Sequence, residues 1–307
     1  MTGGVLQYTS NRMISDLTGE VTYKRWLASE DIEMEKKTMK TLLLGAAALA
    51  APLYLIAPGS ASKRQKAPFL GRNFAHRGLH ARDKSVPENS LEAFRLAARA
   101  GYGMELDVQL SRDGQVVVFH DDTLNRVCGV DARVDELSYA ELSQLKLCGT
   151  EYGIPLFSDV LAVVRGRGPL IVELKNGRRN RELCEKTYAL LEDYRGDVCI
   201  ESFNPFIVAW FRLHARDLVR GQLAMRPTEY RKEGYGGVKG FLLGHTLLNV
   251  IARPQFIAYK IGLRPPLVRL AEWMGAMKFD WTSHEPRNER GRDAVIFEFY
   301  KPKLKFK

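Results

Sequence analysis

Cysteine is scarce in this chain. The four cysteines form no Cys-x-x-Cys pair, which argues against a zinc site; they are Cys128, Cys148, Cys184 and Cys199. A chain of 307 residues can bury a large core, so it does not need a disulfide framework. We therefore expect the cysteines to be mostly core residues, with a Cys128–Cys148 bridge as the alternative.

Acidic residues are also in the minority. The sequence has 36 Asp and Glu residues against 46 Lys and Arg residues, a formal net charge of +10 at pH 7. A basic surface suits an anionic partner. Nothing in the sequence resembles a nucleic-acid-binding module, so we predict no nucleic-acid partner and favour a membrane surface or a phosphate-bearing substrate. With 45% hydrophobic and 27% charged residues, the composition is that of a globular protein and excludes general disorder.

Charge is absent from residues 41–57, which are almost all apolar. A helix of this length spans roughly 25 Å, at the short end of what crosses a bilayer. We predict an uncleaved signal anchor. The alternatives are a cleaved signal peptide, because small residues occur at 57–61, and a buried helix of a soluble domain. Basic residues flank both ends, so the positive-inside rule nearly cancels, and the order basic, apolar, small favours an extracytoplasmic position for the domain C-terminal to this segment.

The chain divides further by composition. Residues 1–33 are polar without clear periodicity, and we interpret them as a flexible tail or as sequence before a start at Met34 or Met39. Residues 34–57 form the anchor or signal segment. Residues 58–71 are predicted to be a linker, because Pro, Gly and basic residues gather there, and residues 72–307 a single large domain.

Short apolar runs alternate with helical stretches from residue 72 onward, which favours a parallel sheet with helices on its faces. A first helix is predicted after Asn89, which would be its N-cap with Glu92 at the third helical position, and Gly101 would end it. The predicted strands are 73–78, 104–110, 116–120, 169–175, 198–203, 219–224, 256–261, 277–282 and 294–299.

Nine strands are one more than an eight-stranded barrel holds. The run Ser111–Gly114 is a tight-turn signature, and the gap is too short for a helical crossover, so 116–120 should fold back on 104–110 as a hairpin. We predict an α/β fold, a TIM barrel with an insertion over about residues 108–165 after its second strand. In such a barrel, functional side chains gather at the C-terminal ends of the strands.

Three acidic residues lie on predicted strands. Glu105 and Asp107 are two residues apart, so they point to the same side, and Glu173 lies near the end of a later strand. Carboxylates on one face repel each other unless a cation lies between them. Oxygen ligands favour Mg²⁺ or Ca²⁺ over zinc, so we predict a divalent cation here. The alternative is that Glu105 and Asp107 form ion pairs with a nearby Arg or Lys.

Basic and aromatic residues stand at the same strand ends. Arg77 can bind phosphate oxygens bidentately and Lys175 can add a point charge, although a solvated strand end is the alternative for Lys175. His76 and His120 suit the roles of general acid and base, the alternative being two structural histidines. Trp281 is either an apolar wall of the pocket or a core residue.

These residues fall in motifs that resemble the glycerophosphodiester phosphodiesterase family over most of residues 72–299. The motifs are His76-Arg77-Gly78, Pro87-Glu88-Asn89-Ser90, Glu105-Leu106-Asp107-Val108, Asp113-Gly114, His120-Asp121, Glu173-Leu174-Lys175, Ser202-Phe203 and Trp281-Thr282.

The resemblance implies a TIM barrel with an insertion after its second strand and one divalent cation, commonly Ca²⁺ or Mg²⁺. It implies hydrolysis of glycerophosphodiesters to sn-glycerol 3-phosphate and an alcohol. Applied motif by motif, it implies that the two histidines are the acid–base pair, the three carboxylates are metal ligands, and Arg77 and Lys175 contact phosphate.

Other functions remain open. A lysophospholipase D or a polymeric glycerophosphate hydrolase at the membrane would use the same chemistry, and an inactive barrel scaffold would use none. The sequence departs from the common family pattern at Ser283, His284 and Glu298. We expect these three residues on the far side of the pocket, where they would affect the choice of leaving group.

Overall fold

The computed structural model describes residues 33–45, 47–48 and 50–307. The contacts divide the chain at residue 53, and the compact unit that follows spans residues 54–307. The described part of the chain contains one helix, Glu33–Ile56, that is long and apolar enough to cross a membrane. Its last residues already belong to the second unit.

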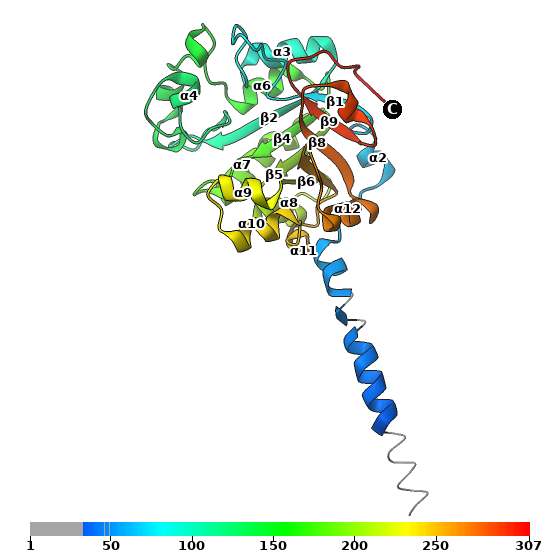
Figure 1. Ribbon diagram of the computed structural model, residues 1–307. Coiled ribbons are helices and arrows are strands. Elements are labelled where there is room, and N and C mark those ends of the chain that lie inside the picture. The colour runs from blue at the N-terminus through cyan, green and yellow to red at the C-terminus, as the bar shows by residue number, and fades with distance from the viewer. Residues whose placement is uncertain (1–32, 46, 49) are drawn as a thin grey trace, which may run out of the picture. The chain divides into compact units, whose positions relative to one another are not determined.

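The second unit is a closed barrel of eight parallel strands (Figure 1). The strand order is β1-β9-β8-β7-β6-β5-β4-β2, and β1 pairs with β2 to close the ring, while β3 adds to β2 in antiparallel sense. The TIM barrel and all nine predicted strands are therefore confirmed. The bounds are β1 Arg72–Ala75, β2 Gly103–Leu110, β3 Val116–Val118, β4 Leu170–Leu174, β5 Val198–Ser202, β6 Val219–Ala224, β7 Phe256–Lys260, β8 Met277–Ser283 and β9 Ala294–Phe297.

Helices surround the barrel and bury the outer faces of its strands (Figure 1). This arrangement explains the continuous apolar runs, since strands covered on both sides contact either helices or the barrel interior. Apart from the short elements between β2 and β4 described below, the helices outside the barrel are α2 Lys63–Lys66, α3 Leu91–Ala100, α6 Phe157–Val164, α7 Asn180–Glu192, α8 Pro205–His214, α9 Pro227–Lys232, α10 Gly237–Gly244, α11 Asn249–Ala252, α12 Pro266–Trp273 and η3 Pro286–Glu289.

The start of α3 differs from the prediction. Ser90, not Asn89, is the N-cap, and its hydroxyl accepts a hydrogen bond from the Ala93 backbone N–H. Asn89 adopts a left-handed backbone with φ of 56° and is 2% exposed. Its side chain does not cap the helix. Gly101 ends the helix in the left-handed conformation as predicted, with φ of 80°.

Between β2 and β4 the chain builds a small substructure with its own apolar core. It holds β3, α4 (Asn125–Cys128), η1 (Val134–Glu136), α5 (Tyr139–Leu142) and η2 (Leu147–Gly149). The Gln109 amide donates hydrogen bonds to the carbonyl oxygens of Phe119 and Asp121, which ties the residues after β3 to β2. All four cysteines are free, so the alternative of a Cys128–Cys148 bridge does not hold.

The segment before β1 packs on the barrel from Tyr54 onward. Ile56 is fully buried, and its carbonyl oxygen accepts a hydrogen bond from the Asn249 amide at 3.0 Å. The Arg253 guanidinium donates to the carbonyl oxygens of Tyr54 and Ala57. Phe69, inside the predicted linker, is 2% exposed. The chain therefore joins the barrel through specific contacts that begin in the last turn of its apolar helix.

Candidate active site

The three predicted metal ligands meet inside the barrel at the C-terminal ends of two strands. Asp107 on β2 lies opposite Glu173 on β4 in the strand register, and Glu105 lies one inward position earlier. One oxygen from each carboxylate lies within 4.8 Å of the others, and Glu105, Asp107 and Glu173 are 2%, 0% and 7% exposed. On β4, the inward-facing residue two positions before Glu173 is the apolar Ile171. The barrel interior therefore changes from apolar to acidic toward the C-terminal ends of the strands.

Burial and crowding set the charge state of this cluster. Burial raises the pKa of Glu105 well above its usual value, and Asp107 and Glu173 raise it further. Burial also raises the pKa of Glu173, against the opposing effect of Lys175. For Asp107 burial acts in the same direction, but the positive charges around it, first those of His120 and Lys175, lower its pKa overall. Glu105 therefore has the least compensated negative charge of the three.

The donor set fits a divalent cation. All three groups are carboxylates on rigid strands, and Oδ1 of Asp107 is buried and accepts no hydrogen bond from the described residues. Hard oxygen ligands of this kind suit Ca²⁺ or Mg²⁺. The acidic cluster and its geometry thus indicate a divalent metal site.

Two basic residues line the same cluster. The Lys175 ammonium lies 2.9 Å from Oε1 of Glu173 and 3.4 Å from Oδ1 of Asp107. Burial would lower the pKa of Lys175, but these two carboxylates raise it, so the lysine stays charged. The Arg77 guanidinium lies 3.6 Å from Asp107, and its backbone N–H donates to Oε2 of Glu105 at 2.9 Å. Arg77 has a φ of 52°, and residues with such a backbone cluster at functional sites.

His76 lies directly after β1, deep in the site. Its Nδ1 is 2.5 Å from Oε1 of Glu298, and its Nε2 is 3.8 Å from Oε2 of Glu105. Burial lowers the pKa of His76, while the hydrogen bond to Glu298 opposes that shift. A carboxylate at Nδ1 favours the tautomer with its proton on Nδ1, which leaves Nε2 as the basic nitrogen.

His120 comes shortly after β3 and has a matching arrangement. Its Nδ1 is 2.6 Å from Oδ1 of Asp121, and Arg126 contacts the other oxygen of Asp121 at 2.6 Å. Arg126 also forms an ion pair with Glu88 in the loop before α3. Burial would raise the pKa of Glu88, but Arg126 and Arg77 outweigh it and lower this pKa to about 2. This chain of ion pairs connects the substructure after β2 to the loop after β1 and so holds His120 near the barrel mouth.

Trp281 forms part of an apolar wall beside the site. Its indole N–H donates to the Ala258 carbonyl oxygen at 3.0 Å, and its ring meets the Phe203 ring edge-on at 5.6 Å. Ser202, in the same motif as Phe203, is fully buried and donates to the Leu174 carbonyl oxygen. Ser202 therefore fixes β5 against β4, and Phe203 presents its ring to the wall.

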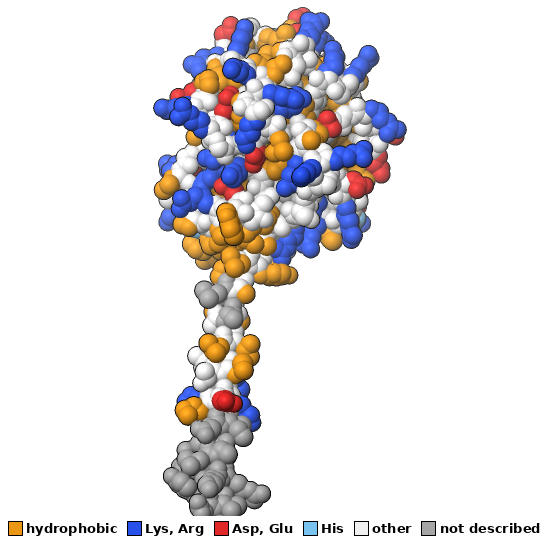
Figure 2. Space-filling view, turned by 90° about the vertical axis from the view of Figure 1, so that its right-hand side faces the viewer, with side chains coloured by type: hydrophobic (Ala, Val, Ile, Leu, Met, Phe, Trp, Pro, Cys, Tyr) orange, Lys and Arg blue, Asp and Glu red, His pale blue; other side chains and the backbone are white. Residues whose placement is uncertain are grey.

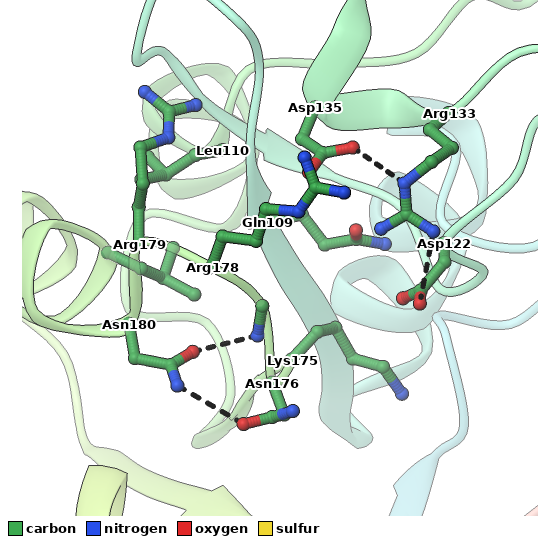
Figure 3. A pocket seen from close by; sticks show the side chains of 12 residues that line it. Gln109, Leu110, Asp122, Arg133, Asp135, Lys175, Asn176, Arg178, Arg179 and Asn180 are labelled. Atoms are coloured by element: carbon green, nitrogen blue, oxygen red, sulfur yellow. Dashed lines mark hydrogen bonds and ion pairs between the residues drawn. The ribbon is translucent and has the colours of Figure 1, made fainter.

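A basic groove leads away from Lys175. Figure 3 shows the loop after β4 on one side and the substructure after β2 on the other. Arg178 is exposed and has no acidic partner within the described ranges, whereas Arg133 is paired with Asp122 and Asp135. Lys and Arg side chains are also spread over the face of the barrel unit seen in Figure 2.

Sequence reasoning missed several residues that hold the site. Asn89 donates to Oδ2 of Asp107 at 2.9 Å, and Glu201 on β5 lies buried beside the carboxylates with its pKa raised well above the usual value by burial. The expectation that Glu298 lies on the far side of the pocket is wrong, because it contacts His76 directly. The signal that could have found Glu298 is an acidic residue directly after a continuous apolar strand.

Comparison with known proteins agrees with this geometry. A family model described as "Glycerophosphoryl diester phosphodiesterase family" matches residues 76–300. The match covers most of the chain, so the protein belongs to this family, and the resemblance drawn from the motifs is confirmed.

Individual relatives match over shorter stretches. A glycerophosphodiester phosphodiesterase of Bacillus altitudinis is 35% identical over 45% of this chain and 60% of its own length. A lysophospholipase D of Rattus norvegicus is 33% identical over 47% of this chain and 48% of its own length. The chain thus spans about half to three-fifths of the length of these relatives.

Among solved structures, a phosphodiesterase of Oleispira antarctica in complex with the product sn-glycerol-3-phosphate superposes with a TM-score of 0.61. The two sequences are 24% identical, and the superposition covers 76% of this chain and 94% of that one. At this identity the likeness shows that the two proteins share a fold.

Proposed function

We propose that this protein is a metal-dependent phosphodiesterase that hydrolyses glycerophosphodiesters to sn-glycerol 3-phosphate and an alcohol. The observation that carries the proposal is the convergence of three buried carboxylates, two basic side chains and two carboxylate-bound histidines at one barrel mouth. The name of the Bacillus altitudinis relative supports the same activity.

The residues divide by chemistry. Glu105, Asp107 and Glu173 are the proposed metal ligands, and a bound Ca²⁺ or Mg²⁺ ion would neutralise charge on a phosphoryl oxygen. Arg77 and Lys175 bind the phosphate. Because Nδ1 is occupied by a carboxylate in both histidines, the reacting nitrogen of each is Nε2.

The histidines of the proposed site take complementary proton-transfer roles. One Nε2 accepts a proton from the attacking water, whose oxygen forms the new P–O bond, and the other donates a proton to the alcohol oxygen that leaves as its P–O bond breaks. The apolar wall of Phe203 and Trp281 lies beside the site and offers an apolar contact surface on that side. The scaffold alternative has little support, because every residue of the chemical set is present.

An activity assay tests this proposal. The full chain, purified in detergent, should release glycerol 3-phosphate from glycerophosphocholine or glycerophosphoglycerol. EDTA should abolish the release, and added Ca²⁺ or Mg²⁺ should restore it, the better of the two identifying the metal. Activity that survives EDTA, or no hydrolysis of any glycerophosphodiester, would contradict the proposal.

We propose further that Glu33–Ile56 is an uncleaved membrane anchor, with the barrel on the extracytoplasmic side. The support is Ile56, which is fully buried against the barrel and bonded to Asn249. Cleavage at residues 57–61 would remove Ile56 and expose the apolar surface that it covers. Mass spectrometry of the protein from cell membranes should find the peptide that spans residues 54–60 intact, and a mature N-terminus inside 57–61 would contradict the anchor.

A further inference from the structure

We infer that the outside of the barrel carries a further anion site, built from Arg212, Arg216 and Arg220, which binds a phosphate group. The inference goes beyond the proposed function, because these residues lie apart from the carboxylates inside the barrel. Arg220 is the second residue of β6. Its neighbour Val219 packs in the barrel interior, and successive residues of a strand point to opposite faces, so the Arg220 side chain lies on the outer face of the barrel wall.

Arg220 is a buried cation without a counterion. Two arginines are buried in the described part of the chain, Arg220 at 7% and Arg264 at 6% exposure. Arg264 pairs with Glu272 and Asp280. The Arg220 side chain has no hydrogen bond or ion pair with another described residue, and its Nε is buried. A buried charge is costly unless an opposite charge joins it, so Arg220 lacks a partner that a bound anion would supply.

The charges around Arg220 have the same sign as its own. Arg212 lies in the last turn of α8, and Arg216 is exposed in the loop between α8 and β6. Burial and these two cations lower the pKa of Arg220 to about 10. Asp217, which follows Arg216 in the sequence, is exposed and does not offset this effect. The three guanidinium groups therefore repel each other until an anion joins them.

Hydrogen bonds fix the surroundings of this cluster. The Arg212 guanidinium donates to the carbonyl oxygens of Val250 and Ile251 at 3.3 Å and 2.9 Å, so carbonyl groups rather than a carboxylate hold it. The backbone N–H of Arg220 donates to Oε1 of Gln255 at 3.0 Å. These contacts join the end of α8 and the start of β6 to the α11–β7 segment, so the charged groups are carried by a rigid part of the barrel.

Gly59 keeps one side of the Arg220 guanidinium open. A Cβ atom at residue 59 would lie 3.4 Å from Nη2 of Arg220, and it would also collide with the carbonyl oxygen of Arg253. The Gln255 amide donates to the carbonyl oxygen of Ser60 at 2.9 Å and so keeps this segment in place. The glycine therefore lets the chain pass beside the guanidinium without a side chain that covers it.

A phosphate group fits this set of donors. Each guanidinium presents its N–H groups in a fixed fork that matches a pair of phosphate oxygens. Phosphate has more oxygens than a carboxylate, so more than one of the arginines can bind it at once. The same chemistry is offered by a phospholipid headgroup and by free phosphate.

The course of the chain favours the phospholipid headgroup, and this step rests on the proposed anchor. Gly59 follows Ile56, the last residue of the apolar helix, by three residues, which span at most about 11 Å. A helix that crosses a bilayer ends at its headgroup layer. The Arg220 guanidinium beside Gly59 would then lie within reach of the phosphates of that layer.

The helix α2 adds positive charge beside the site. The Gln65 amide donates to the carbonyl oxygen of Asp217 at 3.2 Å, which places α2 next to the loop that holds Arg216. Lys63 and Arg64 are exposed on this helix and form no ion pair with a described residue. Basic residues next to a membrane-spanning helix attract anionic phospholipids, so α2 strengthens the preference for a lipid phosphate.

Thermal unfolding tests the site. The full chain in detergent and EDTA is titrated with inorganic phosphate, against sodium chloride of equal ionic strength. At a phosphate concentration about tenfold above Kd, the Tm of the parent should rise by about 4 °C more than that of Arg220→Met. Phosphate bound at the proposed active site affects both proteins equally and cancels in this difference.

Two further variants complete this experiment. Arg216→Ala removes an exposed cation of the site and leaves the core intact, so its response should be smaller than that of the parent even if Arg220→Met does not fold. Arg99→Met is the matched control. Arg99 is exposed at the end of α3, which connects β1 to β2 across the ring from β6, so this variant should respond like the parent. A parent-like response of Arg220→Met or of Arg216→Ala overturns the inference.

Native mass spectrometry of the full chain in detergent distinguishes the two sources of phosphate. Dioleoyl phosphatidylglycerol should bind the parent about fivefold more tightly than Arg220→Met. Dioleoylglycerol, which has the same acyl chains and no phosphate, should bind both proteins equally. If the Tm responses differ as expected but phosphatidylglycerol binds both proteins equally, the ligand is free phosphate and the headgroup assignment is overturned.

Hydrolysis of glycerophosphoglycerol in phosphate-free buffer separates this inference from the proposed function. Because Arg220 lies outside the barrel, Arg220→Met should hydrolyse this diester within about twofold of the parent rate. If the parent hydrolyses no glycerophosphodiester but the Tm responses differ, the proposed function fails and the anion site stands. If hydrolysis is normal and the Tm responses are equal, the activity stands and the anion site fails.

Discussion

Two groups of buried charges in this barrel differ in their balance. Arg264 pairs with Glu272 and Asp280, and Arg292 lies 2.9 Å from Asp280, so this group sets two cations against two anions. The barrel mouth holds four carboxylates, those of Glu105, Asp107, Glu173 and Glu201. The two cations that contact them are Arg77 and Lys175, so negative charges outnumber positive ones. Folding alone would not favour such an excess of negative charge, since buried like charges destabilise a protein.

The difference indicates what each group does. The balanced group joins α12, β8 and the segments before α12 and β9, which is a structural task. The unbalanced group is completed only by a ligand that brings positive charge, as a divalent cation does. Perturbed carboxylates of this kind are typical of functional sites. Variants in the two groups should therefore separate activity from stability.

The largest expected effect is the loss of activity in Glu105→Gln. A neutral amide oxygen binds a divalent cation much more weakly than a carboxylate does, so kcat/KM should fall by about a thousandfold or more. The measurement is release of glycerol 3-phosphate at saturating Ca²⁺ or Mg²⁺. Activity within tenfold of the parent would show that Glu105 is not a metal ligand.

The same variant should change how stability depends on pH in the absence of metal. The folded pKa of Glu105 lies above its usual value of 4.5, so between these two values the folded state binds more protons than the unfolded state. Stability in EDTA should then fall as pH rises above 4.5, by at most about 1.4 kcal/mol per pH unit for this group. Glu105→Gln should reduce that slope in thermal melts taken from pH 4 to pH 8, and an unchanged slope would contradict the unbalanced charge.

Breaking the balanced group should have the opposite signature. Glu272→Gln leaves the buried Arg264 with one partner fewer and should lower the free energy of unfolding by about 3 kcal/mol. Because the group lies outside the proposed site, KM and kcat of the folded fraction should stay near those of the parent. Urea unfolding combined with kinetics at low temperature checks both results, and a selective loss of kcat would assign this group to catalysis.

A divalent cation should stabilise the parent protein but not Glu105→Gln. At a cation concentration about a hundredfold above Kd, binding to the folded state adds about 2.7 kcal/mol. The measurement is the shift in Tm on titration with Ca²⁺ or Mg²⁺ after EDTA treatment and dialysis. Equal shifts in the two proteins would place the binding site elsewhere.

The smallest expected effect is in Glu298→Gln. An amide still reaches Nδ1 of His76 but loses the negative charge, so kcat should fall roughly tenfold. Burial lowers the pKa of His76 and Glu298 opposes that shift, so neutralising Glu298 should lower this pKa further and move the limb of the pH–rate profile that His76 controls to lower pH. A uniform loss of rate without a shifted limb would indicate a purely structural role for Glu298.

Much of the fold was predictable because local patterns and tertiary structure agree. Continuous apolar runs such as Leu170–Val172 fit strands covered on both sides, and the turn at Ser111–Gly114 leaves no room for a helical crossover. The cap of α3 was misassigned because Asn89 and Ser90 are both good caps by type. The tertiary structure distinguishes them, because Asn89 donates to Asp107 and Ser90 accepts from the Ala93 N–H.

The sequence alone determined the barrel, the family, and the identity of the carboxylates, histidines and basic residues gathered at its mouth, because each of them ends an apolar run or lies in a short motif. Only the tertiary structure decided which groups support them. Glu298 contacts His76, and Arg126 connects Glu88 to Asp121. The residues of the Glu298–His76 and Arg126–Glu88 contacts lie far apart in the sequence, so a local sequence pattern does not predict them. Closure of the ring brings the first and last strands together, and that long-range pairing places Glu298 beside His76.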